Sequence, residues 1–130
     1  MGTFSAKISQ FIDKTNKSAD FVMRKVTIDL TQRVKMKTPV DTGALRASWT
    51  ASLGAQPTTF NGSESVNMNA KFGDTWYLAT DKPYAPMLEY GLYPTPGSDK
   101  TVDGYSIQAP KGMVRISVKE TLNWLKRVKL

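Results

Sequence analysis

Four carboxylic acids of this sequence, Asp41, Glu89, Asp99 and Asp103, are the side chains that could perform acid–base chemistry. Two acids can protonate a leaving group and activate a water molecule, as in glycoside hydrolysis. The chain contains no histidine and no cysteine, which removes the Ser-His and Cys-His nucleophile pairs and the usual zinc ligands. It also has no glycine-rich phosphate loop and no nucleophile elbow. We therefore expect a protein that is not an enzyme, with no catalytic residues, no metal and no cofactor.

Basic charge is the second chemical feature, with a net charge of +7 that is concentrated at both ends. Residues 1–37 carry eight Lys and Arg against three Asp, residues 38–110 carry four against seven acids, and residues 111–130 carry six against one. Such an excess favours a polyanionic partner, although helices also carry Lys and Arg on their solvated faces. Binding of nucleic acid through basic helical termini is therefore an alternative function. No helix-turn-helix or zinc-finger pattern accompanies the charge.

A long amphipathic helix is predicted for residues 1–37. Its apolar residues recur at steps of three, four or seven: Phe4, Ile8, Phe11, Ile12, Ala19, Val22, Val26 and Leu30. Pro39 ends the helix, because the residue before a proline avoids the helical region. At 1.5 Å per residue the helix would be about 50 Å long, whereas a compact domain of this size is only about 30 Å across. We expect part of the helix to overhang and a neighbouring subunit to cover its apolar stripe.

Residues 38–90 are expected to form a turn, a β-meander and a short helix. Asp41 or Thr42 can cap a short helical turn, because their side-chain oxygens accept from free backbone N–H groups. Three segments read as strands, the first two by their alternation of apolar and polar residues: 47–53 with Trp49 on the buried face, 66–72, and 75–80. We expect a small antiparallel sheet of about three or more strands. Residues 84–90 are expected to form a short helical turn, with Ala85, Leu88 and the aromatic residues facing the core.

Residues 91–112 contain three prolines and four glycines and show little periodicity. A loop of this length is usually functional or mobile. We expect a mobile loop that becomes ordered on a partner, with Tyr93 and Tyr105 as the candidate interface side chains, because an aromatic ring with a hydroxyl gives a large contact area for few frozen torsions. Residues 113–130 are predicted to form an amphipathic C-terminal helix packed on the sheet. The expected fold is α+β, with residues 1–130 in a single domain.

Three short motifs occur in order along the chain: TPVDTGALRASW at 38–49, PYAPMLEYG at 83–91 and PKGMVR at 110–115. Each has a structural interpretation, since Pro39 breaks a helix, Gly43 permits an unusual backbone angle and Trp49 packs in the core. Glu89 can form a half-buried ion pair with Arg46 or with Arg115.

Together the motifs resemble those of the neck and minor-tail protein family of lambdoid siphophages, the gene-product-ten-like family of HK-type phages. Members of that family look like a long helix, a TPVDTG turn, a small sheet, a YAxxxEyG turn and a C-terminal helix. The matching positions are Thr38, Pro39, Asp41, Thr42, Gly43, Leu45, Arg46, Ser48, Tyr84, Ala85, Glu89, Gly91, Pro110, Met113 and Arg115. Pro86 and the length of the 91–112 segment depart from the family pattern.

The resemblance implies a structural virion protein that completes the tail and joins it to the head. It would form a six-fold ring around the DNA channel, between the connector and the tail. Its partners would be further copies of itself, head-completion or connector proteins, tail terminator or tail tube proteins, and the phage genomic DNA passing through the lumen. We expect it in the host cytoplasm during assembly and then in the virion. No membrane association is expected, because no apolar run approaches the roughly 18 residues that a bilayer span needs.

Overall fold

The computed structural model describes the chain except for residues 1, 16–17, 41–42, 95–96, 98 and 128–130, and except for the side chains of residues 2–5 and 14–15. It confirms a mixed α+β fold. The elements in chain order are α1 (Gly2–Thr15), α2 (Ala19–Lys37), α3 (Ala44–Ser48), β1 (Thr50–Leu53), the 3-10 helix η1 (Ser65–Asn69), β2 (Trp76–Ala79), α4 (Ala85–Tyr90), β3 (Thr101–Val102), β4 (Tyr105–Ser106) and α5 (Val114–Arg127). Within the described residues, no helix is long and apolar enough to cross a membrane.

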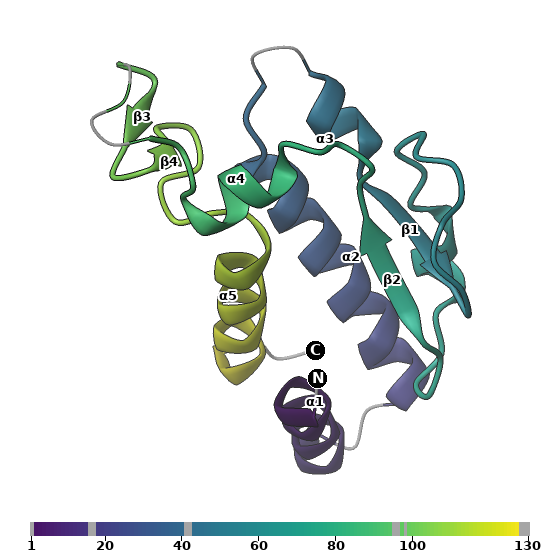
Figure 1. Ribbon diagram of the computed structural model, residues 1–130. Helices are drawn as coiled ribbons and strands as arrows, with labels where there is room; N and C mark the ends of the chain where they lie inside the picture. The colour runs from purple at the N-terminus through teal and green to yellow at the C-terminus, as the bar shows by residue number, and fades with distance from the viewer. Residues whose placement is uncertain (1, 16–17, 41–42, 95–96, 98, 128–130) are drawn as a thin grey trace.

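The prediction of one continuous helix over residues 1–37 is wrong, because α1 and α2 are separate helices. Ser18 has an extended backbone, with ψ of 132°, and α1 lies across the lower ends of α2 and α5 (Figure 1). The turn allows both halves of the apolar stripe to be buried together. The shared cluster contains Ile8, Phe11, Val22, Val26 and Leu125. Because the protein covers its own stripe, the expected overhang and its cover by a neighbouring subunit lose their physical basis.

The main sheet has two strands, so the expectation of three or more is also wrong. β1 and β2 pair in antiparallel register, from Thr50 opposite Ala79 to Leu53 opposite Trp76. The segment 66–72, predicted to be a strand, instead overlaps η1, which spans Ser65–Asn69. Asn67 explains the difference: it is 2% exposed, its Nδ2 donates to Thr31 Oγ1 at 3.0 Å, and its Oδ1 accepts from Trp76 Nε1 at 2.7 Å. A buried side-chain amide needs such partners, and the partners of Asn67 are side chains of α2 and β2.

The first predicted strand begins three residues later than expected. Residues 44–48 form α3, and β1 starts at Thr50. Trp49 is 5% exposed, as expected for a core residue, but Ala47 on the same predicted face is exposed. The alternation from residue 47 to residue 53 therefore spans a helix end and a strand.

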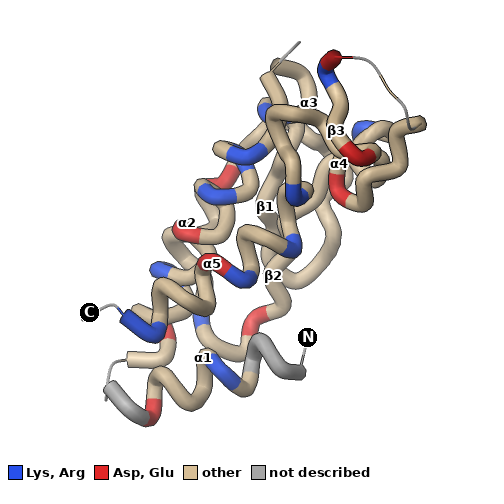
Figure 2. Tube along the Cα trace, turned by 90° about the vertical axis from the view of Figure 1, so that its left-hand side faces the viewer, with Lys and Arg blue, Asp and Glu red and all other residues tan. Residues whose placement is uncertain are grey.

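The C-terminal helix α5 packs mainly on α2 and α1, and not on the sheet as predicted. Ser117 and Thr121 on its inner face are fully buried, and small side chains there allow the two helices to approach closely. Thr121 Oγ1 donates to Asp29 Oδ2 on α2 at 2.8 Å. Charged residues alternate along the exposed sides of both helices (Figure 2), and Glu120 of α5 binds Lys37 of α2. The packing surface of α5 is thus partly polar, which favours a helix partner that offers matching groups.

Residues 91–112 contain regular structure, so the expectation of an irregular loop is wrong for part of this segment. β3 and β4 form a two-stranded hairpin, with Thr101 opposite Ser106. Tyr93 N–H donates to the Gly104 carbonyl at 3.0 Å, and Ala109 is 1% exposed. The hairpin stands beside α4 at the upper end of the molecule (Figure 1). Its mobility remains a prediction. We refer to residues 91–112 below as the hairpin lobe.

Candidate functional site

The first motif anchors the end of α2 through Thr38, which is 1% exposed. The Thr38 hydroxyl donates to the Val34 carbonyl at 2.8 Å and accepts from Trp49 Nε1 at 2.9 Å. Met113 Sδ, from the third motif, lies 3.5 Å from the same hydroxyl. A single buried hydroxyl therefore connects the end of α2, the start of β1 and the start of α5.

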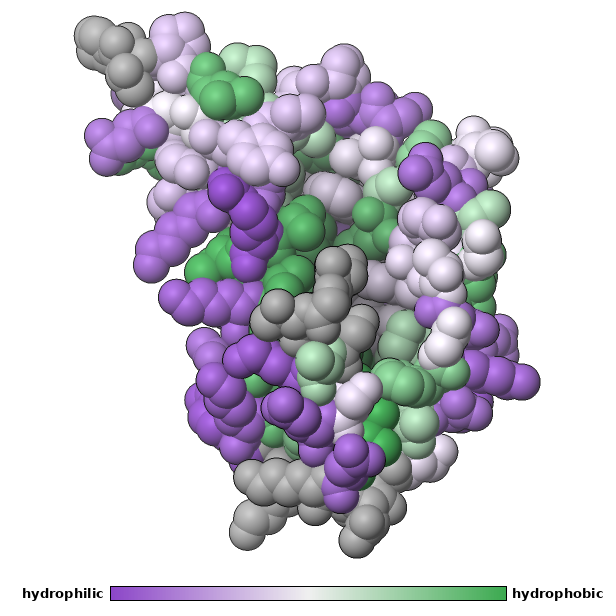
Figure 3. All heavy atoms as spheres, turned by 60° about the horizontal axis from the view of Figure 1, so that its bottom comes forward, coloured by the Kyte–Doolittle hydropathy of each residue, from purple (hydrophilic) through white to green (hydrophobic). Residues whose placement is uncertain are grey.

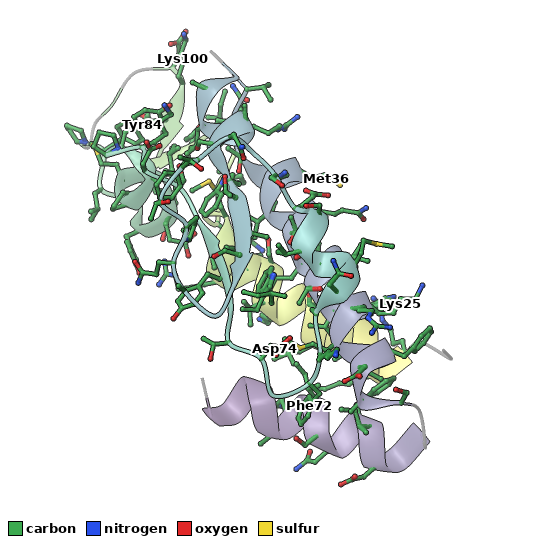
Figure 4. The ribbon with its side chains drawn as sticks, turned by 90° about the vertical axis from the view of Figure 1, so that its right-hand side faces the viewer. Lys25, Met36, Phe72, Asp74, Tyr84 and Lys100 are labelled. Atoms are coloured by element: carbon green, nitrogen blue, oxygen red, sulfur yellow. The ribbon has the colours of Figure 1, made fainter. Side chains whose placement is uncertain are left out.

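Arg46 caps the carbonyl end of α2 instead of pairing with Glu89. Its Nη2 donates to the Thr38 carbonyl at 3.0 Å and to the Met36 carbonyl at 3.3 Å. These carbonyls have no partner within the helix, and a cation is favourable at this end of the helix dipole. The side chain of Met36 points away from the protein (Figure 4). The role of Arg46 within the described structure is therefore local.

The turn between α2 and α3 depends on Gly43, which is the N-cap of α3 with a φ of +73°. The two predicted cap residues, Asp41 and Thr42, lie outside the described residues. Pro39 precedes them and is half-buried, and Leu45 is 2% exposed in the main core. Ser48 Oγ donates to the Leu45 carbonyl at 2.7 Å and also contacts Thr80 Oγ1, which connects α3 to the end of β2.

The centre of the site is Glu89, a carboxylate that is 7% exposed. Its Oε1 accepts from the backbone N–H groups of Met113 and Val114, both at 2.7 Å. Its Oε2 accepts from the backbone N–H and from Nε of Arg115, both at 3.0 Å. Glu89 on α4 thus caps the N-terminus of α5, where free N–H groups and the helix dipole both favour a negative charge.

The electrostatics of Glu89 follow from this arrangement. Burial by itself raises the pKa of its carboxyl group, but the backbone N–H groups of Arg115, Val114 and Met113, followed by the Arg115 side chain, outweigh burial and hold the pKa below the ordinary value. Glu89 is therefore a stable carboxylate with both oxygens occupied. That is a poor starting point for a proton-transfer catalyst.

Arg115 also binds the C-terminal end of α4. Its Nη2 donates to the Glu89 carbonyl at 2.9 Å, and its guanidinium lies over the Tyr90 ring, 4.5 Å from the ring centre. The Glu89 carboxylate raises the pKa of Arg115, and the Tyr105 hydroxyl adds to this effect. Of the two partners that the sequence suggested for Glu89, the structure has Arg115.

We call the junction of α2, α4 and α5 around Thr38, Glu89 and Met113 the joint. Two glycines allow its segments to approach closely. Gly112 has a φ of +82°, and a Cβ there would lie 2.6 Å from the Glu89 carbonyl oxygen. Gly91 ends α4 with a φ of +66°, and a Cβ there would lie 2.4 Å from the Tyr105 ring. Gly112 was not among the sequence candidates, although it lies inside the third motif. The residues PKG at 110–112 come directly before the predicted C-terminal helix, and this position was the signal that could have identified Gly112.

The remaining candidates surround the joint. Tyr84 is the half-buried N-cap of α4, Ala85 is 8% exposed, and Pro110 is exposed. Tyr93 is half-buried against the main core and Tyr105 packs on Gly91, so both interface candidates also make contacts within the chain. Asn67 was not predicted from the sequence, because no periodic pattern or motif marks it as a buried residue.

A hollow of about 420 Å³ lies next to the joint, between the end of β2 and the start of α5. Its walls include Trp49, Leu78, Ala85, Met113 and Val114. Figure 3 shows hydrophobic atoms gathered in a depression on this side of the molecule, with hydrophilic side chains around it. Within the described residues, no three His, Cys, Asp or Glu side chains are placed to hold a metal ion.

Comparison with protein-family models, with curated proteins and with solved structures found no match for this chain.

Proposed function

We propose that this protein is a structural subunit of the tailed-phage neck, which completes the tail and joins it to the head. The observation that carries the proposal is the joint between Thr38, Glu89 and Met113. These residues come from three motifs that are far apart in the sequence, yet one hydroxyl and one carboxylate connect them. Motifs that together determine one junction of the fold are what a shared family architecture requires, and this supports the resemblance from which the function is inferred.

The chemistry of the joint supports a structural role over a catalytic one. Glu89 uses both oxygens to cap α5, and the Thr38 hydroxyl is buried among protein partners. Neither group is available to a substrate. The Glu89 carboxylate and the Thr38 hydroxyl have their hydrogen-bond partners within the protein, and buried polar groups that are paired in this way make a fold rigid and specific, which suits a protein that must hold its shape within an assembly.

The hairpin lobe supports a docking role. Leu92, Val102 and Ile107 are 59%, 53% and 51% exposed, which is unusual for large apolar side chains that occur close together in one segment. In this proposal the lobe, including Tyr93 and Tyr105, packs against a neighbouring component of the neck. Ordering of its chain would cost about 1–2 kcal/mol per backbone residue fixed, so docking needs a substantial contact.

The assembly is a six-fold ring around the DNA channel, between the connector proteins above and the tail terminator or tail tube below. Identical contacts of one kind close such a ring. The ring rests on the resemblance, because α1 already covers the apolar stripe that had suggested a neighbour. The protein is made in the host cytoplasm and then enters the virion, where the phage DNA passes through its lumen.

An amber mutation in the gene for this protein tests the proposal. We expect DNA-filled heads and separate tails, because heads and tails assemble independently and the protein that connects them is missing. Purified protein added to the mutant lysate should restore infectious particles. A folded Leu92→Ser/Ile107→Ser variant should fail to do so, whereas Met68→Ser, at an exposed site on η1, should succeed. Normal infectious particles from the amber mutant would refute the assignment, and salt-dependent DNA binding by the free protein would favour the alternative of a nucleic-acid-binding protein.

A further inference from the structure

The hairpin of β3 and β4 has an apolar face that is open to solvent. Thr101 and Ser106 lie opposite each other in the pair, and Ser106 is buried. Val102 and Ile107 each follow one residue later, and side chains alternate across a strand, so both lie on the opposite face. Their side chains are 53% and 51% exposed. The hairpin therefore buries its polar face against the protein and presents two large aliphatic side chains outward.

The hollow beside the joint has a matching character. Its walls include the apolar side chains of Leu78, Pro86 and Val114, and its volume is about 420 Å³. This volume falls within the range of about 300–1,000 Å³ that is common for ligand pockets. Neither Val102 nor Ile107 lines the hollow, so the hairpin does not fill the hollow of its own chain.

The charges around the two surfaces are also compatible. Glu89 lines the hollow, but its carboxylate already accepts from the backbone N–H groups at the start of α5. The other charged residues of the hollow are Asp81 and Lys82, one of each sign. Residues 100–107 likewise carry one charge of each sign, Lys100 and Asp103. A nearly neutral hollow favours an apolar occupant with balanced charges over a strongly acidic or strongly basic one.

The hairpin and the hollow occupy different parts of the molecular surface. β3 and β4 project beyond α4 at the upper left of Figure 1, away from α2 and the main sheet. The hollow lies between the end of β2 and the start of α5. An apolar patch that is complementary to a pocket elsewhere on the same molecule produces a head-to-tail contact between copies. Repetition of such a contact closes a ring when the rotation between neighbours allows it.

We propose that the hairpin lobe of one copy places Val102 and Ile107 in the hollow of a second copy of this chain. The occupant is a second copy because the chain itself supplies both halves of the contact, with compatible polarity and charge. A standard interface involves about 20–30 residues a side, so residues 100–107 alone give a weak contact, which closure of a ring strengthens. The contact follows from the hairpin and the hollow, whereas its use in a ring of the neck rests on the proposed function.

Analytical ultracentrifugation of the full chain tests the contact. We expect the average mass to rise with concentration, with a Kd of about 10–500 µM. A lobe variant, Val102→Ser/Ile107→Ser, and a hollow variant, Pro86→Trp at an exposed position that lines the hollow, should each weaken association about tenfold. Met68→Ser and Thr58→Trp, at exposed positions outside both surfaces, should leave association unchanged. Circular dichroism checks that all four variants are folded.

Mixing the two variants tests the head-to-tail arrangement. The lobe variant keeps its hollow and the hollow variant keeps its hairpin, so an equal mixture should form pairs of one copy each and no larger species. Cysteine cross-linking gives a second measurement, because the chain contains no cysteine. A disulfide between Ile107→Cys in one chain and Pro86→Cys in another should form about tenfold faster than one between Ile107→Cys and Met68→Cys.

Three results would overturn the proposal. They are a wild-type protein that stays monomeric up to about 1 mM, association that neither the lobe variant nor the hollow variant weakens, and a disulfide that forms no faster than the control pair. The amber mutant tests the neck function separately. Free heads and tails from that mutant, together with a monomeric protein, would retain the neck function and remove this contact. Normal particles together with the expected self-association would do the reverse.

Discussion

Replacing Glu89 by Gln tests the joint at its centre. The substitution keeps the size of the side chain and removes the negative charge that caps α5. The amide oxygen can still accept from Met113 and Val114, but the second oxygen becomes an NH2 group that faces the N–H and the Nε of Arg115. Two donors then lose their acceptor.

The size of the effect follows from these contacts. A hydrogen bond to a charged group contributes about 1.5–3 kcal/mol against about 1 kcal/mol for a neutral one, and an N-cap contributes about 0.5–2 kcal/mol. The Arg115 side chain is 58% exposed, so solvent screens its ion pair and it adds little. We expect the free energy of unfolding to fall by about 2–4 kcal/mol, which lowers Tm by about 6–16 °C in a domain of this size.

The assay is urea denaturation and thermal melting of Glu89→Gln beside Glu64→Gln. Glu64 pairs with Lys35 at 2.6 Å but its side chain is 42% exposed, so its loss should cost about 0.5 kcal/mol or less. Equal stability of the two variants would refute the capping role of Glu89.

The pH dependence gives a second readout. The pKa of Glu89 in the folded protein lies below its ordinary value of 4.5. Its stabilisation is therefore complete above that ordinary value, and it is lost as the pH falls through the lower, folded-state value. The stability difference between the wild type and Glu89→Gln should shrink over that acidic window. Glu120, whose pKa Lys37 also lowers, titrates in both proteins and cancels in the difference. A difference that stays constant from neutral pH to well below the ordinary value would contradict the assignment.

Two further substitutions address packing and backbone geometry. Trp49→Ala should destabilise the fold by about 3–5 kcal/mol, because it empties a core position that is 5% exposed; an unchanged urea midpoint would show that Trp49 does not support the core. Gly112→Ala places a Cβ 2.6 Å from the Glu89 carbonyl oxygen at a φ of +82°, and should lower Tm much more than Gly73→Ala, where φ is +103° but no atom lies within 4 Å. Similar losses for the two glycine variants would mean that the contact with Glu89 relaxes freely.

The candidate site could be predicted from the sequence only in part. Glu89 and Arg115 stood out as a charged pair within motifs, yet the spacing did not distinguish Arg115 from Arg46, since both lie far from Glu89 along the chain. The capping of α5 by Glu89 requires α4 and α5 to meet through the hairpin lobe, and Gly112 to approach closely. Such contacts depend on backbone turns that leave no periodic pattern.

The sequence by itself determined the α+β class, the helical character of α2 and α5, and the strand at 76–79, because periodicity and turn residues act over a few neighbouring positions. Only the tertiary structure decided where the N-terminal stripe turns, since Ile8 and Phe11 are buried only when Leu125 comes to meet them. It also decided that Asn67 belongs to a 3-10 helix, because the partners of its buried amide come from α2 and β2. Local pattern sets which face of a segment is apolar, and remote residues set what that face packs against.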